Sequence, residues 1–358
     1  MGNHKKKRQR TMPQGTPARP GQKPKNVVPS LLDVMKDDNE YGSIVSLVPE
    51  NGNIVPEVLR ALADIESVRG RSCLCYAANV VRSGAPDTAI VSADHLPLSE
   101  MVSRVDPAAK EVDILLATPG GSAEQVNLFV EALRPRFDTV DFLIPYKAMS
   151  AGTLWALSGD RIWMDERAFL GPLDPQVPSK DGTYVPAQAL LTLLDKIQRE
   201  GDAALAKKEN PPWALIRLLD QMDQKQLGAA ISASDYVATM AAQYLEQYKF
   251  RTWQFHGSSG QAVTADEKRQ RAREVAGVLC SHDRWKAHGH AISRDVLWKE
   301  VRILIDRPED QDGLQRAMRR LWALLYYTFD KSPVVKLMVS SGYSFFRSQH
   351  ILTMEAQQ

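Results

Sequence analysis

Short apolar segments alternate with helix-like segments in the middle of this chain, and this alternation constrains the fold more than any other feature of the sequence. Such segments are typical of buried strands and of the helices that connect them. The strand-like segments are 112–117, 139–144 and 161–164, and the helix-like ones are 98–105, 123–133 and 151–158. Strands that alternate with helices form a mainly parallel sheet with both faces covered. The sequence therefore predicts an α/β fold.

The flanking segments indicate how the rest of the chain is organised. Residues 31–70 have helical spacing, and further strands are predicted over 72–81 and 88–91. After residue 186 the pattern changes to long helices, which we expect over 187–200, 212–227 and 232–248. The predicted units are a basic tail over 1–30, an α/β domain over 31–250 and a helical C-terminal extension over 251–358.

The charge of the 358-residue chain is nearly balanced, with 45 Lys and Arg against 43 Asp and Glu. A body with this balance has no general attraction for nucleic acid or anionic membranes. Residues 1–26 differ, because they contain eight basic residues, four prolines and no acidic residue. Such a segment is predicted to be disordered, and we expect it to stay solvated rather than to bind nucleic acid or an acidic partner.

The sequence indicates a cytoplasmic protein without a transmembrane segment. It contains no apolar stretch of the roughly 20 residues that a membrane span requires, and the residues after the basic start are too polar for a secretory signal. Cys73, Cys75 and Cys280 have no spacing typical of a disulfide framework or a zinc site. We therefore predict no metal and no cofactor.

The first motif that suggests chemistry is Thr118-Pro-Gly-Gly-Ser122, directly after the strand-like segment 112–117. Paired glycines let the backbone turn sharply and leave N–H groups uncovered by side chains, which suits an oxyanion. Most Pro-Gly-Gly turns have no catalytic role, so this motif indicates a site only in combination with a second one.

The second motif, Ala148-Met-Ser-Ala-Gly-Thr153, follows the strand-like segment 139–144. A serine at a strand-to-helix corner exposes its hydroxyl and has a helix N-terminus beneath it, which suits a nucleophile. Ser150 could equally be a plain N-cap. Because neighbouring parallel strands end at one edge of the sheet, we expect the glycine turn and Ser150 to face each other.

Two stretches, ILLATPGGSAEQVNLFVEALR and IPYKAMSAGTLWALSGDRIWMDERAFLGPLDPQV, together resemble the serine dehydrogenase proteinase family. That family belongs to the Clp/crotonase-like superfamily, alongside signal peptide peptidase A and the ClpP protease. The resemblance is close over 112–177 and rests on the motifs TPGG, AMSAGT and LGPLDPQ in that order. It implies a Clp/crotonase-like fold with repeated ββα units and the activity of an ATP-independent serine endopeptidase.

The resemblance also implies roles for individual residues. Ser150 would be the nucleophile, and the backbone N–H groups of Gly121 and Ala151 would form the oxyanion hole, with Gly120 shaping the turn. Acyl transfer needs donors aimed at the developing oxyanion, and losing one typically costs about 3 kcal/mol of transition-state stabilisation.

The general base is harder to assign. In ClpP-type enzymes a histidine follows the serine helix, but the comparable stretch FLGPLDPQV contains none. Relatives of signal peptide peptidase A use a lysine from a downstream helix, which burial keeps neutral by lowering its pKa. Lys196 in AQALLTLLDKIQRE is the lysine predicted for this role, and Lys180 is a second candidate. As an ordinary residue of an amphipathic helix, Lys196 would simply be solvated, and Lys180 lies in the loop after the DPQ motif.

A group of histidines offers a third source of a base. His282, His288 and His290 could orient a base or bind a metal, or they could lie on the surface without a role. Asp174 in LGPLDPQ either orients the base or holds the turn before Pro175. These four residues are therefore predicted as supporting residues of the site.

The sequence leaves three functions open. The first is a serine peptidase that acts on polypeptides through an acyl-enzyme, and the second is an inactive scaffold or binding protein with the same fold. The third, a crotonase-like acyl-CoA enzyme, has less support because those enzymes do not need a serine at the corner. The superfamily forms rings or stacks in which helical arms cover the next subunit, so we also expect a homo-oligomer that uses the helical region 187–250.

Overall fold

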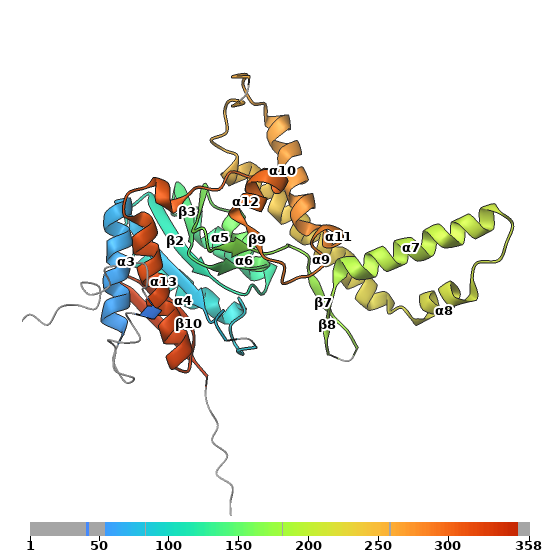
Figure 1. Cartoon of the computed structure of the whole chain (residues 1–358), viewed down its shortest axis with the longest axis horizontal. Coiled ribbons are helices and arrows are strands. Elements are labelled where there is room, and N and C mark those ends of the chain that lie inside the picture. Colours follow the sequence, from blue (N-terminus) through green and yellow to red (C-terminus); the bar gives the residue numbers. More distant parts are fainter. Residues whose placement is uncertain (1–40, 43–53, 83, 181, 258, 350–358) are drawn as a thin grey trace, which may run out of the picture.

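The computed structural model describes residues 41–42, 54–82, 84–180, 182–257 and 259–349 (Figure 1). The basic tail predicted over 1–30 lies outside these residues. Within them the chain forms a mixed α/β fold around a largely parallel central sheet, as the alternating pattern predicted.

The central sheet has the strand order β11-β10-β1-β2-β3-β5. Its strands are β1 (Ser72–Ala78), β2 (Glu111–Ala117), β3 (Thr139–Ile144), β5 (Arg161–Met164), β10 (Val334–Ser340) and β11 (Tyr343–Ser348). The β1–β2, β2–β3 and β3–β5 pairs are parallel, whereas β10 and β11 are antiparallel to their neighbours. The carboxyl ends of β2 and β3 therefore lie at the same edge of the sheet.

Helices cover both faces of this sheet (Figure 1). One face packs against α3 (Val55–Arg69) and α13 (Leu314–Lys331). The other packs against α4 (His95–Ser103), α5 (Ala123–Leu133), α6 (Ala151–Leu157), α9 (Gln224–Tyr244) and α10 (Ala265–Cys280). Two apolar cores result, one on each side, and the predominantly apolar strands in the sequence reflect burial on both faces.

The C-terminal segment differs from the helical extension predicted over 251–358. It contributes β10 and β11 to the central sheet, and β10 pairs directly with β1. The run Val334–Ser340 contains Lys336, whose side chain is nevertheless fully buried in an ion pair with Asp94. This segment is therefore part of the central fold rather than an appendage.

A helical arm projects from the body (Figure 1). It begins at the hairpin of β7 (Gln176–Pro178) and β8 (Tyr184–Pro186), continues through α7 (Ala187–Ala206) and α8 (Trp213–Gln221), and returns along α9. The single helix predicted over 212–227 is divided in two, because the Asp223 carboxylate accepts hydrogen bonds from the N–H groups of Lys225 and Gln226 and so begins α9.

Short elements complete the fold. They are β4 (Lys147–Ala148), β6 (Phe169–Leu170), β9 (Ile292–Ser293), α11 (His282–Trp285), α12 (Arg294–Val296), the 3-10 turns η1 (Ser92–Asp94) and η4 (Pro308–Asp310), and the π-helical turns η2 (Leu245–Lys249) and η3 (Leu297–Val301). β4, β6 and β9 form a small sheet of their own. Among the described helices, none combines the length and the apolar character needed to cross a membrane.

Candidate active site

Ser150 lies at a strained corner between β4 and α6. Its backbone has φ 50° and ψ −118°, a conformation that residues other than glycine rarely adopt. Although Ser150 occupies the N-cap position of α6, its side chain caps no backbone group and makes no hydrogen bond within the described residues. The geometry thus presents a free, half-buried hydroxyl above the first turn of a helix, as in a nucleophile elbow.

The Gly120–Gly121 turn packs directly against this corner. Gly120 has φ 105°, and a β-carbon added there would lie 2.7 Å from the Met149 carbonyl oxygen and 2.9 Å from the Ser150 β-carbon. Gly121 has φ 146°, and its β-carbon would lie 2.4 Å from backbone atoms of Ile90. Only glycine fits at either position, because the backbone of this turn touches neighbouring backbone on both sides.

Two backbone N–H groups at this corner have no acceptor within the described part of the chain. They belong to Gly121, which follows the β2 turn, and to Ala151, the first residue of α6. Neighbouring groups are occupied, since the Gly120 N–H donates to the Thr118 hydroxyl and the Gly152 N–H donates to the Met149 carbonyl. The two unpaired donors are those predicted for an oxyanion hole.

A cavity of about 740 Å³ opens over these groups. Ser150, Ala151, Gly120, Gly121 and His288 all line it. Its other walls are mostly apolar or aromatic and include Ile90, Val91, Leu154, Leu173, Tyr184, Tyr236 and Val237. Among them, Tyr184 of β8 and Tyr236 and Val237 of α9 come from the base of the arm. No sequence motif indicated this contribution.

His288 is held by a buried carboxylate. Its Nδ1 lies 2.7 Å from Oδ1 of Asp174, whose side chain is only 1% exposed. The antiparallel pairing of Leu170 in β6 with Ile292 in β9 brings the two loops together. The Nδ1–H donates to the carboxylate, so Nε2 is left as the basic nitrogen. No hydrogen bond joins His288 to the Ser150 hydroxyl among the described residues.

The other predicted base candidates lie elsewhere. Lys196 is on the arm helix α7, where its side chain is 65% exposed and its Nζ lies 3.8 Å from Oε1 of Glu200. Lys180 is 76% exposed and pairs with Asp223. Neither lysine lines the cavity that contains Ser150. Within a single chain, the structure therefore places neither Lys196 nor Lys180 at the Ser150 cavity.

The remaining histidines differ in their surroundings. His282 Nδ1 lies 3.2 Å from the second oxygen of Asp174, Oδ2. His290 is exposed, and its ring lies 5.2 Å from that of Trp285. No group of three or more His, Cys, Asp or Glu side chains in the described ranges has an arrangement that could hold a metal ion.

A buried ion pair stabilises the segment that contacts the Gly120–Gly121 turn. The Lys336 Nζ donates to Asp94 Oδ2 at 2.6 Å and to the Ala89 carbonyl at 2.7 Å, and burial lowers the pKa of the lysine. The adjacent Ile90 N–H donates to the Gly120 carbonyl, and the Ile90 carbonyl accepts from Ser122. The position of the Gly120 turn therefore depends on β10, far away in the sequence.

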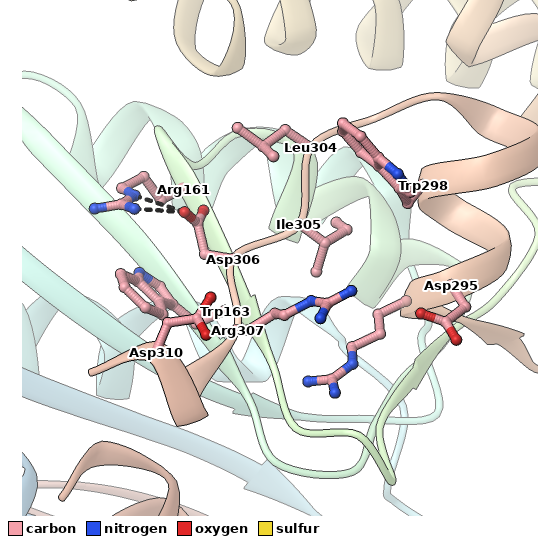
Figure 2. Close-up of a pocket in the computed structure, with 10 residues that line it drawn as sticks. Arg161, Trp163, Asp295, Trp298, Leu304, Ile305, Asp306, Arg307 and Asp310 are labelled. Atoms are coloured by element: carbon pink, nitrogen blue, oxygen red, sulfur yellow. Dashed lines mark hydrogen bonds and ion pairs between the residues drawn. The ribbon is translucent and has the colours of Figure 1, made fainter. Parts of the chain in front are cut away.

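A second cavity, of about 380 Å³, lies along the other edge of β5 (Figure 2). The Arg161 guanidinium pairs with the Asp306 carboxylate there, beside Trp163, and Trp298 and Leu304 lie on its outer side. None of the residues predicted from the sequence as site residues lines this cavity. Of the predicted site residues, Gly120, Gly121, Ser150, Ala151 and His288 line the Ser150 cavity instead.

Comparisons with known proteins point to the same part of the chain. Residues 98–205 match the model of the family described as ClpP-like SDH-type serine proteinases. Two uncharacterized proteins of Methanocaldococcus jannaschii are similar. One is 38% identical over 93 residues, which are 26% of this chain and 31% of the relative. The other is 35% identical over 102 residues, 28% and 34% of the two chains. The chain thus spans about a third of the length of the curated relatives it matches.

Solved structures give more distant matches. One is a lysine-to-alanine mutant of the 1510-N membrane-bound stomatin-specific protease in complex with a substrate peptide, with 16% identity and a TM-score of 0.33 over 61% of this chain and 70% of that chain. A serine-to-alanine mutant of the same protease has 15% identity and a TM-score of 0.34, over 61% and 74%.

Proposed function

We propose that this chain is a serine peptidase with Ser150 as its nucleophile, and we start from the match of residues 98–205 to the ClpP-like SDH-type serine proteinase family. The observation that carries the proposal is the set of protein groups that one cavity brings together. It contains a serine in a strained corner, two backbone N–H groups with no acceptor among the described residues, and a histidine held by a buried carboxylate. These are the parts that acyl transfer requires.

In the proposed reaction, His288 Nε2 takes the proton of the Ser150 hydroxyl while the oxygen attacks the carbonyl carbon of the scissile peptide bond. The N–H groups of Gly121 and Ala151 stabilise the oxyanion that forms. His288 then gives its proton to the departing amine, which leaves an ester on Ser150. Water, activated by the same imidazole, hydrolyses this ester and restores the hydroxyl.

Asp174 has an orienting role in this scheme. It holds the His288 Nδ1–H and so fixes the tautomer whose Nε2 is free to accept a proton. When His288 gains a proton from Ser150, the buried carboxylate lies next to the resulting imidazolium and stabilises it. This arrangement supports His288 as the base in preference to Lys196, which is solvated on the arm.

The substrate and assembly are part of the proposal. The largely apolar wall formed by Leu154, Leu173 and Val237 favours an endopeptidase that accepts apolar side chains of a polypeptide next to the cleaved bond. We propose that it acts in the cytoplasm, without an ATPase. The exposed apolar residues of the arm favour a homo-oligomer: Leu205, Trp213, Ile216, Leu219 and Ile231.

Active-site labelling tests the function and the base together. We expect a fluorophosphonate probe to label Ser150 in the wild type and in Lys196→Ala, with cleavage of casein retained in both. Ser150→Ala should neither label nor cleave, and His288→Ala should lose about 10⁴-fold or more in kcat. Thermal unfolding of each variant checks that it is folded.

The opposite outcomes are equally informative. Full activity in His288→Ala together with loss of activity in Lys196→Ala would favour the lysine base that the sequence predicted. A folded wild type that neither labels nor cleaves would support the alternative function, an inactive scaffold or binding protein.

A further inference from the structure

The buried Asp174 carboxylate contacts two imidazoles, and only one of them lines the Ser150 cavity. Oδ1 lies 2.7 Å from His288 Nδ1, and Oδ2 lies 3.2 Å from His282 Nδ1. The carboxylate is 1% exposed, so water does not provide an easy substitute for either donor. Each oxygen of a buried carboxylate needs a donor, since an unsatisfied charged group costs far more than an ordinary hydrogen bond contributes.

His282 is on the better-supported of the two segments. It is the first residue of α11, and the Ser281 hydroxyl before it accepts a hydrogen bond from the Arg284 N–H. The indole of Trp285 in the same turn donates to the Val278 carbonyl of α10. The segment that carries Asp174 is joined to the same helix end, because the Leu173 N–H donates to the Leu279 carbonyl.

His288 has no comparable support. It lies in the stretch between α11 and β9, outside any helix or strand. Within the described residues, the contact with Asp174 is the hydrogen bond that fixes its ring. A carboxylate held at one oxygen can rotate about its Cβ–Cγ bond, whereas one held at both oxygens keeps a single orientation.

We propose that His282 is a positioning residue for the catalytic histidine. Its Nδ1–H occupies Oδ2 of Asp174 and thereby keeps Oδ1 directed at His288. This inference rests on the proposed peptidase function, in which Asp174 and His288 act together. His282 itself touches neither substrate nor Ser150, since it does not line the cavity.

The nearby thiol does not compete for this role. Burial, followed by the proximity of Asp174, raises the pKa of Cys280 to about 12, so that the thiol stays neutral at physiological pH and adds no charge to the group. His290 provides a matched control, because it lies in the same segment but packs on Trp285.

The test compares His282→Ala, His282→Asn and His290→Ala in the full chain. The amide nitrogen of asparagine stands near the position of an imidazole Nδ1, so His282→Asn keeps the donor and removes the ring. We expect His282→Ala to lower kcat by about 10–100-fold with little change in KM, since a hydrogen bond to a charged group is lost. His282→Asn should recover most of the wild-type kcat, and His290→Ala should match the wild type.

A second readout does not depend on activity. In protein with ¹⁵N-labelled histidine, the Nδ1–H of His288 should give a slowly exchanging downfield proton signal, assigned by its loss in His288→Gln. The signal should broaden or disappear in His282→Ala and persist in His282→Asn.

These readouts separate failure of this inference from failure of the proposed function. A wild-type kcat and an unchanged signal in His282→Ala would overturn the positioning role while leaving the peptidase intact. Equal losses in His282→Asn and His282→Ala would also overturn it, because the ring rather than the donor would then matter. If the wild type is inactive, the peptidase proposal fails, and the proton signal still reports on the Asp174 contact.

Discussion

Gly120 packs against Ser150 with no room for a side chain: a β-carbon at Gly120 would lie 2.9 Å from the β-carbon of Ser150. Gly120 also has φ 105°, which residues with a side chain rarely adopt. We therefore expect Gly120→Ala to abolish activity by displacing Ser150 and to lower the free energy of unfolding by more than about 2 kcal/mol. Chemical denaturation and casein cleavage measure the two effects.

Gly70→Ala is the control for this prediction. Gly70 has φ 66°, but a β-carbon there would meet no atom within 4 Å. This variant should lose about 1 kcal/mol from backbone strain and keep full activity. Equal loss of activity in the two variants would contradict the contact-based account.

Asp174→Asn tests the orientation of His288. The asparagine keeps the shape of the side chain but offers His288 an amide in place of a carboxylate oxygen, which favours the wrong tautomer and removes the charge that stabilises the imidazolium. We expect kcat to fall by about 10⁴-fold with a nearly unchanged KM. Steady-state kinetics on a fluorogenic peptide give both constants. A kcat close to that of the wild type would remove Asp174 from the mechanism.

Lys249 should make stability depend on alkaline pH. Burial lowers the pKa of this lysine from 10.5 to about 8, although Asp306 lies 3.9 Å away. Because the folded pKa is the lower one, the unfolded chain binds more protons between pH 8 and 10.5, and stability rises with pH across that window. Lys249→Met should remove this increase, which amounts to at most about 3 kcal/mol.

Urea unfolding at a series of pH values measures this difference. Lys207→Met, at an exposed position on the arm, should follow the wild-type pH dependence. Parallel curves for the wild type and Lys249→Met would show that the buried amine does not titrate in this range.

The apolar face of α8 should be an oligomer interface. Trp213 is 78% exposed, and Ile216 and Leu219 follow it at three-residue spacing on the same face of the helix. We expect Trp213→Glu combined with Leu219→Glu to reduce the molar mass measured by light scattering to that of the monomer. Trp298→Glu, at a 56% exposed tryptophan outside the arm, should leave the assembly unchanged. A wild-type chain that is already monomeric would refute the interface.

The sequence predicted the centre of the fold well because burial on both faces of a parallel sheet leaves a clear apolar pattern. The helix predicted over 123–133 has these bounds in the structure, and the strands over 112–117 and 139–144 are present. The proximity of Gly120 and Ser150 could also be predicted, since both follow neighbouring parallel strands.

Contacts between distant segments could not be read from local pattern. The leucine spacing around Lys196 fits a helix against a core and a helix in a projecting arm equally well, and the structure has the second. Pairing of Asp174 with His288 depends on the β6–β9 ladder, and each of those strands has only two residues. Strand β10 was not predicted because Lys336 interrupts its apolar run, and the contacts of this lysine with Asp94 and the Ala89 carbonyl come from a distant segment.

The position of β10 in the sheet determines when the fold can be completed during translation. β1 emerges from the ribosome long before β10, its neighbour on one side, has been synthesised. A nascent chain therefore displays Ser150 long before His288 and Lys336 have been synthesised. Until His288 and Lys336 have been made, the Gly120–Gly121 turn lacks the buried ion pair that stabilises it and Ser150 lacks its proposed base. Late completion of the sheet thus delays assembly of the proposed peptidase site until β10 has been synthesised.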